Sequence, residues 1–336
     1  MNEAPRRLIV PVRVQGFFQL DGQLYRNKFT RNMGYIIDGL LRRVNVTVYD
    51  SGGTSRTAYT SYGGLLYSAS TTNNMGSPLH FIYGTGVTTP SVTDNWLASA
   101  DATTRNPNHY NDSIEESTET RLLVAGRWAP DASKTLSEAG LGLIVDGYNG
   151  YVTLLARSVL SPSITRTAYT EYYDGYVLRF PASFTRWFVR ALLAATAGYR
   201  YFVCRSTVVT AADGSPLVLQ SNNTFAGTVD VRIGSDNTSP SPTHTNLLSP
   251  IASLSSQSQT VEVDTVLQEV RIVRTGTYTP STNVTLGEIG LFASLNGYRA
   301  GSTASALTMV CRVALDTPVT LNAGTTYTLG IALVFS

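Results

Sequence analysis

The sequence predicts a mainly β protein with two tandem β-sandwich-like domains, each of which begins with a helix. Three observations support this expectation. An internal repeat divides the chain in two, apolar residues gather in short runs bounded by turn residues, and only 14% of the 336 residues are charged although 43% are hydrophobic. That hydrophobic content is enough to form a sizeable core. With so little charge, the surface must take its polarity from Ser, Thr, Asn and Tyr, which suits a β protein that assembles with others.

The internal repeat is the strongest signal in the sequence. About a third of the residues are identical where three pairs of segments align without gaps, namely 81–100 on 231–250, 119–141 on 269–291 and 157–180 on 312–335. The repeat predicts three parts: an N-terminal arm and hairpin over residues 1–28, and two β-rich repeats over residues 29–180 and 184–335. The linker between the repeats is short, so we expect the domains to pack side by side.

A hairpin is expected in front of the first repeat. The apolar residues Val12, Val14, Phe18 and Leu20 are spaced mostly by two, and Asp21-Gly22 is a strong tight-turn signal before residues 23–29. The Arg6-Arg7 stretch that precedes them is expected to be a loose arm. Two interpretations of this arm stay open: a frayed terminus, or a segment that reaches onto a neighbouring subunit.

Each repeat is predicted to open with a helix. Over residues 31–43 the apolar side chains form one stripe of a 3.6-residue helix, and Thr30 is placed to cap it. The matching helix of the second repeat is predicted from Thr185 to about residue 197, with an end at Gly198. It is apolar nearly all round, so we expect it to be buried, between the two repeats.

Short strands are expected to fill the rest of each repeat, because runs rich in Val, Thr, Tyr and Leu alternate with Gly, Pro, Asn and Asp. In the first repeat the expected strands are residues 45–49, 79–83, 120–125, 140–145, 151–157 and 172–180. In the second repeat they are residues 201–210, 228–233, 270–274, 290–293, 307–314 and 327–335. This pattern favours a β-sandwich over alternating βαβ units.

Charge and hydropathy exclude several classes of protein. The 25 basic and 23 acidic residues leave a net charge of +2, which is too small to indicate specific nucleic-acid binding. No apolar run is long enough for a membrane span, since Arg190 and Arg200 interrupt the best candidate. Cys204 and Cys311 fit neither a disulfide framework nor a metal site, and we expect a buried free thiol at Cys311.

Catalytic signals are absent from the sequence patterns. Gly84-Thr85-Gly86 lacks the spacing of a dinucleotide-binding loop and is interpreted as a turn. The histidines His80, His109 and His244 lie in no metal-binding motif, and no G-x-S-x-G element occurs. We therefore predict no catalytic residue, no metal ligand, no cofactor and no enzymatic activity.

Two glutamates occupy matched places in the repeats, each followed one residue later by Gly-Leu. They could ligate Ca²⁺ or interact with a sugar, but a carboxylate at the start of a strand more often accepts hydrogen bonds from backbone N–H groups or from an arginine. We expect this structural role, with the matched arginines as partners. The repeat-matched residues are Glu138, Gly140, Leu141 and Arg157 in the first repeat, and Glu288, Gly290, Leu291 and Arg312 in the second.

These motifs resemble a virion structural module of tailed phages and related viruses. In that module the equivalent stretch reads like I-T-E-x-G-L-F, then L-x-x-R, then a closing strand. The second repeat contains E-I-G-L-F from Glu288 and Cys311-Arg312, whereas the first has Gly142 in place of the phenylalanine. The resemblance covers nearly the whole chain outside residues 1–28. It implies a location in the virion, as a tail, baseplate, fibre or capsid-surface component.

The expected function is therefore that of a virus structural protein that assembles symmetrically with itself, as a trimer or a pseudo-sixfold ring. Expected partners are further copies of the chain and other virion proteins, with host-surface glycans as further candidates. The alternative is a carbohydrate- or host-receptor-binding β-sandwich protein, with recognition in the loop over residues 99–118. The tyrosines that favour this alternative are Tyr169, Tyr172, Tyr173 and Tyr176.

Overall fold

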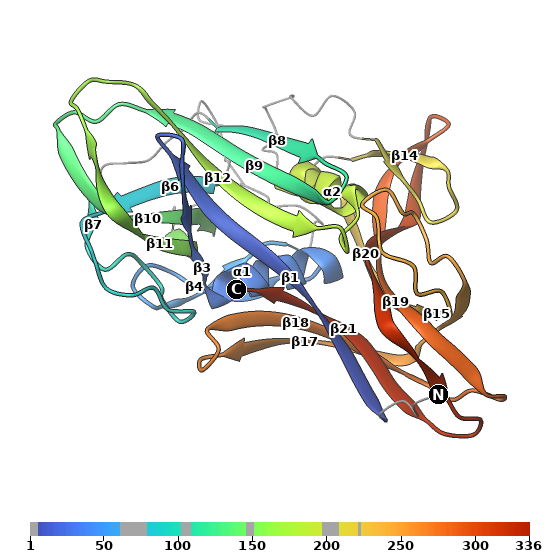
Figure 1. Ribbon diagram of the computed structural model, residues 1–336. Coiled ribbons are helices and arrows are strands. Elements are labelled where there is room, and N and C mark those ends of the chain that lie inside the picture. The colour runs from blue at the N-terminus through green and yellow to red at the C-terminus, as the bar shows by residue number, and fades with distance from the viewer. Residues whose placement is uncertain (1–5, 61–78, 102–108, 146–150, 197–207, 221–222) are drawn as a thin grey trace.

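The computed structural model describes residues 6–60, 79–101, 109–145, 151–196, 208–220 and 223–336. Within these ranges the chain is mainly β, with two helices and several sheets (Figure 1). The predicted mainly β class is confirmed. No helix in the described part of the chain is long and apolar enough to cross a membrane.

The largest sheet has eight strands and runs through both halves of the chain. One side consists of β17 (Ser255–Asp264), β18 (Glu269–Tyr278) and β21 (Tyr327–Phe335). The other side consists of β12 (Tyr172–Pro181), β9 (Glu119–Trp128) and β8 (His109–Glu115). The long strand β1 (Arg7–Leu20) lies between the two sides, and the short strand β2 (Gln23–Arg26) pairs with it. The sheet is continuous because β1 bonds to both halves.

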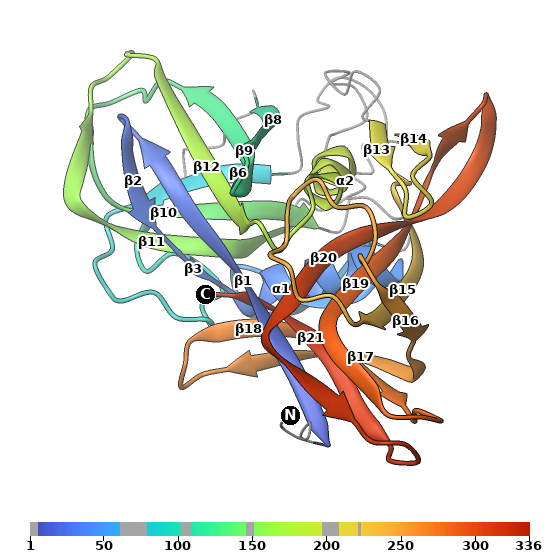
Figure 2. The same cartoon turned by 45° about the vertical axis from the view of Figure 1, so that its right-hand side comes forward.

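The two ends of β1 have different partners. Its first half is parallel to β21, with Arg7 opposite Thr328, and its second half is antiparallel to β12, with Gln15 opposite Arg179. Both views show this strand, in blue, as a diagonal between the two halves (Figures 1 and 2). The eight-stranded sheet is therefore formed from segments at opposite ends of the sequence.

The expected loose arm at Arg6-Arg7 is wrong. The carbonyl of Arg6 accepts a hydrogen bond of 2.8 Å from the N–H of Thr328, and β1 begins at Arg7. The segment is ordered because the ladder with β21 gives its backbone groups partners inside the chain. The predicted hairpin that follows is confirmed: Asp21 and Gly22 have φ angles of 51° and 76° between β1 and β2.

Two further sheets, one in each half, share a core with the large sheet. The first contains, in spatial order, β3 (Lys28–Phe29), β11 (Tyr151–Arg166), β10 (Lys134–Val145), β6 (Leu79–Gly84) and β7 (Ala100–Asp101). The second contains β13 (Val208–Thr210), β14 (Pro216–Leu219), β19 (Val284–Arg299), β15 (Phe225–Gly234) and β16 (Pro250–Ser253), with β20 (Ser302–Leu321) beside β19. β4 (Val46–Tyr49) and β5 (Ser55–Ala58) form a separate pair. Across the sheets, Phe18 of β1 packs edge-on against Phe81 of β6 with ring centres 6.4 Å apart.

The two helices lie between the halves (Figures 1 and 2). α1 (Arg31–Arg42) packs against β11 of its own half and against β15, β17 and β18 of the other, while α2 (Arg186–Thr196) packs against β20, β13, β8 and β9. The predicted burial of the second helix is confirmed, since Trp187, Phe188 and Val189 are all buried. Each helix thus contacts strands from both halves.

The predicted cap of the first helix is wrong. Thr30 occupies the N-cap position, but its hydroxyl donates to the backbone carbonyl of Leu154 instead of capping the helix. The hydroxyl of Thr185 makes the matching bond to Met309, and it also accepts a 3.2 Å bond from the N–H of Phe188. Both threonines therefore tie a helix start to a strand of the same half.

Most predicted strands lie inside observed strands, and several are longer than expected. β11 and β20 run well past residues 157 and 314 because they form long hairpin arms with β10 and β19. Strands β8 and β17 were not predicted. β17 reads SSQSQTVEVD, and its serines and glutamines hide the strand signal that Val, Thr and Tyr provide elsewhere. Of the strand expected over residues 201–210, only residues 208–210 lie within the described part.

Candidate functional site

The first matched glutamate, Glu138, lies on β10 with no exposed surface. Its carboxylate accepts backbone hydrogen bonds from Gly86 at 3.0 Å, Ala98 at 3.1 Å and Ser99 at 2.7 Å. Arg157 of β11 adds two more, from Nε at 3.0 Å and Nη2 at 2.8 Å. The expected pairing with backbone N–H groups and the matched arginine is therefore present.

Arg157 connects this carboxylate to the loops beside it. Its side chain is only 3% exposed, and its Nη1 donates to Asp94 Oδ2 at 2.8 Å. Its Nη2 also donates to the backbone carbonyl of Thr88 at 3.0 Å. A single guanidinium therefore holds the loop between β6 and β7 against the hairpin of β10 and β11.

The second half contains a corresponding pair. Glu288 of β19 is fully buried and accepts hydrogen bonds from the N–H of Ser249 at 2.8 Å and from Arg312 Nε. Arg312 of β20 has a side chain that is 1% exposed, and it donates to the carbonyl of Thr238 at 2.8 Å and to Asp236 at 2.9 Å. Both pairs thus connect a strand hairpin to a long loop.

The additional carboxylate of each site comes from a different loop position. In the sequence alignment Asp94 matches His244, and Gly86 matches Asp236. Asp94 accepts from the N–H of Ser91 at 2.9 Å, and His244 Nδ1 accepts from Ser241 at 3.2 Å, so both side chains close the same turn. Asp94 supplies the negative charge beside Arg157, and Asp236 supplies the equivalent charge beside Arg312.

In the second site the pKa values of Asp236 and His244 are both shifted. Hydrogen bonds from Thr238, together with the charge of Arg312, lower the pKa of Asp236. Burial and the nearby charge of Arg312 lower the pKa of His244. Asp236 is therefore ionised and His244 neutral near neutral pH, as an acceptor role at Nδ1 requires.

The glycines after the two glutamates are required by close packing. A Cβ atom at Gly140 would lie 2.9 Å from the side chains of Leu154 and Leu97, and one at Gly290 would lie 2.7 Å from Leu247. The leucines that follow, Leu141 and Leu291, are each 2% exposed. These four matched residues therefore belong to the core beneath the ion pairs.

Saturation with hydrogen-bond donors decides what Glu138 can do. A carboxylate offers about four lone-pair sites, and Glu138 already accepts five hydrogen bonds. It therefore has no free lone pair for a metal ion. Within the described ranges, no group of three or more His, Cys, Asp or Glu side chains could hold a metal ion. The pairs therefore hold loops in place.

A third buried ion pair was not anticipated. Arg166 and Asp174, both with side chains 0% exposed, are joined at 2.6 Å. Asp174 also accepts hydrogen bonds from the hydroxyl of Tyr83 at 2.5 Å and from Trp128 Nε1 at 2.7 Å. Burial raises the pKa of Asp174 and outweighs the opposing charge of Arg166.

This cluster has no counterpart in the other half. The aligned positions of Arg166 and Asp174 are Leu321 and Leu329, and both leucines are fully buried. Because the cluster does not repeat, a search for matched residues could not find it. The signal in the sequence is limited to one arginine and one aspartate on consecutive strands.

Cys311 is a buried free thiol on β20. Burial raises the pKa of this thiol to about 12, so it stays protonated and unreactive at neutral pH. Cys204 lies outside the described residues. His109 begins β8, and its side chain also lies outside them. The predicted turn at Gly84-Thr85-Gly86 is not found, because Gly84 ends β6 and the N–H of Thr85 donates to the carbonyl of Ser99 at 2.9 Å.

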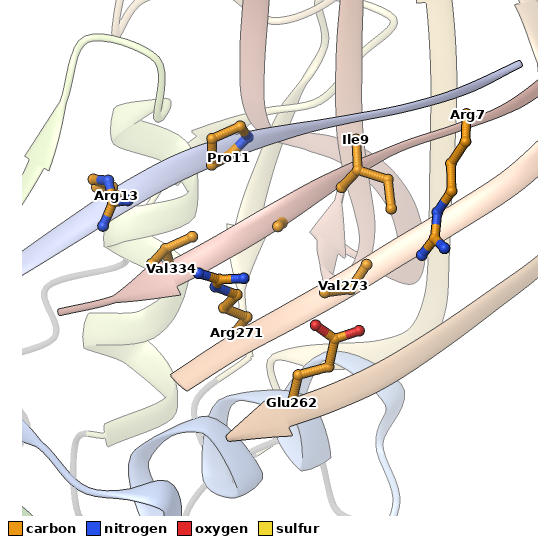
Figure 3. Close-up of a pocket in the computed structure, with 9 residues that line it drawn as sticks. Arg7, Ile9, Pro11, Arg13, Glu262, Arg271, Val273 and Val334 are labelled. Carbon is orange, nitrogen blue, oxygen red and sulfur yellow. The ribbon is translucent and has the colours of Figure 1, made fainter. Parts of the chain in front are cut away.

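A surface groove of about 330 Å³ lies on the outer face of the large sheet. Figure 3 shows that its walls come from β1, β17, β18 and β21, with the side chains of Ile9 and Val273 turned into it. Its apolar floor also includes Val334, and three arginines and Glu262 surround it. The arginines are Arg7, Arg13 and Arg271.

Comparison of the chain with family models, curated proteins and solved structures finds no match. The sites described above are therefore interpreted from their own geometry. They comprise two buried glutamate–arginine pairs, one buried aspartate–arginine cluster and one arginine-lined groove. Of these, the groove alone is open to a partner.

Proposed function

We propose that the chain is a structural protein of a virus particle, in which two copies of one β-sandwich-like domain form a single building block. The proposed copies are residues 29–180 and 184–335, with a helix at the start of each. On this proposal the chain assembles symmetrically with itself and with other virion proteins.

Matched hydrogen bonds outside the glutamate sites support the duplication. The hydroxyl of Tyr172 accepts from the N–H of Thr167 at 2.8 Å, and that of Tyr327 accepts from Asn322 at 2.9 Å. Backbone bonds of 2.8 Å join Tyr169 to Pro130 in the first half and Gly324 to Pro280 in the second. Such details are expected to recur when one domain is copied, because each depends on the local sequence and on the strand register together.

The observation that carries the assembly proposal is an eight-stranded sheet with two open ends. Among the described residues, the outermost strands β8 and β17 each pair on one side only. An open edge is a template for pairing with another chain unless charge or proline protects it. β17 exposes uncharged Ser and Thr side chains along most of its length, for example Ser258 and Thr260. Such an edge favours contact with a neighbouring copy.

The assembly proposal predicts a mass in solution that is a multiple of 36.3 kDa, most simply three copies. Light scattering on the purified chain at micromolar concentration measures this mass. Thr260→Lys places a charge on the β17 edge and should reduce the oligomeric fraction. Thr303→Lys, at an exposed position of β20 away from this edge, is the matched control and should leave the mass unchanged.

A stable monomer at the same concentration would contradict the proposal. Deletion of residues 1–28 is not a useful control, because β1 lies within the large sheet and its removal would expose β21 and β12. Thr260→Lys and Thr303→Lys, in contrast, each change one exposed side chain.

The alternative function, sugar binding, is favoured by two exposed tyrosines. Tyr169 and Tyr173 are 82% and 72% exposed, whereas Tyr176 is fully buried. Exposed aromatic rings can stack on the apolar face of a sugar. On this alternative, retention on immobilised glycans is expected to be lost in a Tyr169→Ala, Tyr173→Ala variant and kept in a Tyr298→Ala control. Absence of retention by the parent chain would reject the alternative.

A further inference from the structure

β1 has two backbone edges, and one of them is open along the first half of the strand. On one side the strand pairs with β21 along residues 7–14 and with β2 along residues 17–20. On the other side it pairs with β12 along residues 15–19. Among the described residues, no strand pairs with that second side over residues 7–13.

The backbone groups along this open edge are those of the odd-numbered residues. The carbonyls of Arg6 and Val14 accept bonds from the β21 side, so the even-numbered residues of β1 direct their backbone groups to β21. Arg7, Ile9 and Arg13 therefore present N–H and C=O groups on the open side. Pro11 presents only its C=O group. Proline is tolerated in an edge strand at such a position, where its missing N–H group would point to the open side.

The side chains of the same odd-numbered residues line the groove on the outer face. Figure 3 places Arg7, Ile9, Pro11 and Arg13 in a row along β1, above the apolar floor. Arg13 bonds to Glu269 but keeps a side chain that is 51% exposed, and Arg7 has no ion pair among the described residues. Glu262 lies at the far wall on β17, three strands away from β1.

We propose that this edge accepts an extended acidic segment of a partner protein, which adds to β1 as a further strand. Main-chain hydrogen bonds would supply affinity, and alternate side chains would supply specificity. Opposite Arg7 and Arg13 the segment carries carboxylates, six positions apart. Opposite Ile9 and Pro11 it carries apolar side chains.

Charge complementarity decides between this occupant and a second copy of the chain. If two β1 strands paired antiparallel about residue 10, Arg7 of each would lie opposite Arg13 of the other. Like charges directly opposite one another destabilise a strand pair. An acidic strand gains from both arginines, so the edge suits a different protein.

The test uses a fluorescein-labelled synthetic peptide with glutamates six positions apart, valines at the two outward positions between them and threonines elsewhere. Fluorescence anisotropy with the full chain should show saturable binding that weakens as salt is added. Arg7→Glu should weaken binding by about tenfold or more. Arg26→Glu changes an exposed arginine on β2 at the other end of β1, and it should leave binding unchanged.

Two altered peptides test the mode of binding. Lysines in place of the glutamates should abolish binding, and N-methylation of the alternate residues that face β1 should do the same if a strand is added. Binding that is absent, or that Arg7→Glu leaves unchanged, would overturn the proposal. A change in the mass of the chain itself in Arg7→Glu would assign the edge to a second copy instead. The result does not depend on the proposed virion role, because the peptide is measured on the folded chain whatever its oligomeric state.

Discussion

Replacement of Glu138 by glutamine is expected to lower the free energy of unfolding by about 3–5 kcal/mol, the range for removal of one partner of a buried ion pair. Every neighbour of this carboxylate is a donor, so in either orientation the amide NH₂ group would face N–H groups. Arg157, whose side chain is 3% exposed, would also lose the carboxylate that accepts two of its hydrogen bonds. Urea denaturation measures the effect, and Glu288→Gln is expected to give a loss of similar size.

The matched control for this experiment is Glu171→Gln. Glu171 also pairs with an arginine, Arg127, but its side chain is 47% exposed. Exposed pairs contribute about 0–1 kcal/mol, so this variant should be close to the parent chain. If Glu138→Gln were as mild as the control, the proposed role of the pair in holding the loop would be incorrect.

The second large effect concerns Arg166 and Asp174. Asp174→Leu alone is expected to cost about 3–5 kcal/mol, because it removes the buried anion beside Arg166 and leaves Asp21, whose side chain is 51% exposed, as the remaining ion-pair partner of this buried guanidinium. Addition of Arg166→Leu should recover a large part of that loss, since the aligned positions of the other half hold two buried leucines, Leu321 and Leu329. A double-mutant cycle by urea denaturation measures this coupling. Strictly additive losses would contradict it.

The cost of Asp174→Leu is expected to depend on pH. Because burial raises the pKa of Asp174 above its ordinary 3.8, the folded chain binds this proton more tightly than the unfolded chain. The stabilisation from this proton is therefore complete below pH 3.8 and is lost as the pH rises through the folded-state pKa. The cost of Asp174→Leu should thus be larger in acid than at neutral pH. A cost that grows as the pH rises would show that the Arg166 charge dominates instead.

The sequence predicted features that are local or that occur twice. The hairpin turn at Asp21-Gly22 has a fixed backbone requirement, and the pairing of Glu138 with Arg157 could be inferred because the same residue types recur as Glu288 and Arg312. The first helix was located because its apolar residues keep a single period, and the second because an apolar run lies between Thr185 and Gly198. In each case the signal lies in one short segment or in a pair of matched segments.

Features that depend on the pairing of distant segments could not be predicted. Nothing in residues 7–14 indicates that their partner is β21, so the Arg6-Arg7 stretch was interpreted as a loose arm before the predicted hairpin. In the alignment Asp94 lies opposite His244 and Asp236 lies opposite Gly86, which looks like two unrelated mismatches. The structure shows that each aspartate pairs with the matched arginine of its own half. The groove could not be anticipated either, because Arg7, Glu262 and Arg271 meet only after the large sheet forms.

The pairing of β1 with β21 also constrains how the protein is made. The partner of Arg7 is Thr328, which a ribosome adds roughly 320 residues later, so this backbone edge of β1 has no partner for most of translation. The hairpin of β1 and β2 can form early, and β12 can join it once the first half is made. The eight-stranded sheet closes only when β21 emerges. A chain interrupted before that point keeps an unpaired strand, which is the form that a cell's quality-control machinery can recognise and remove before it enters an assembly.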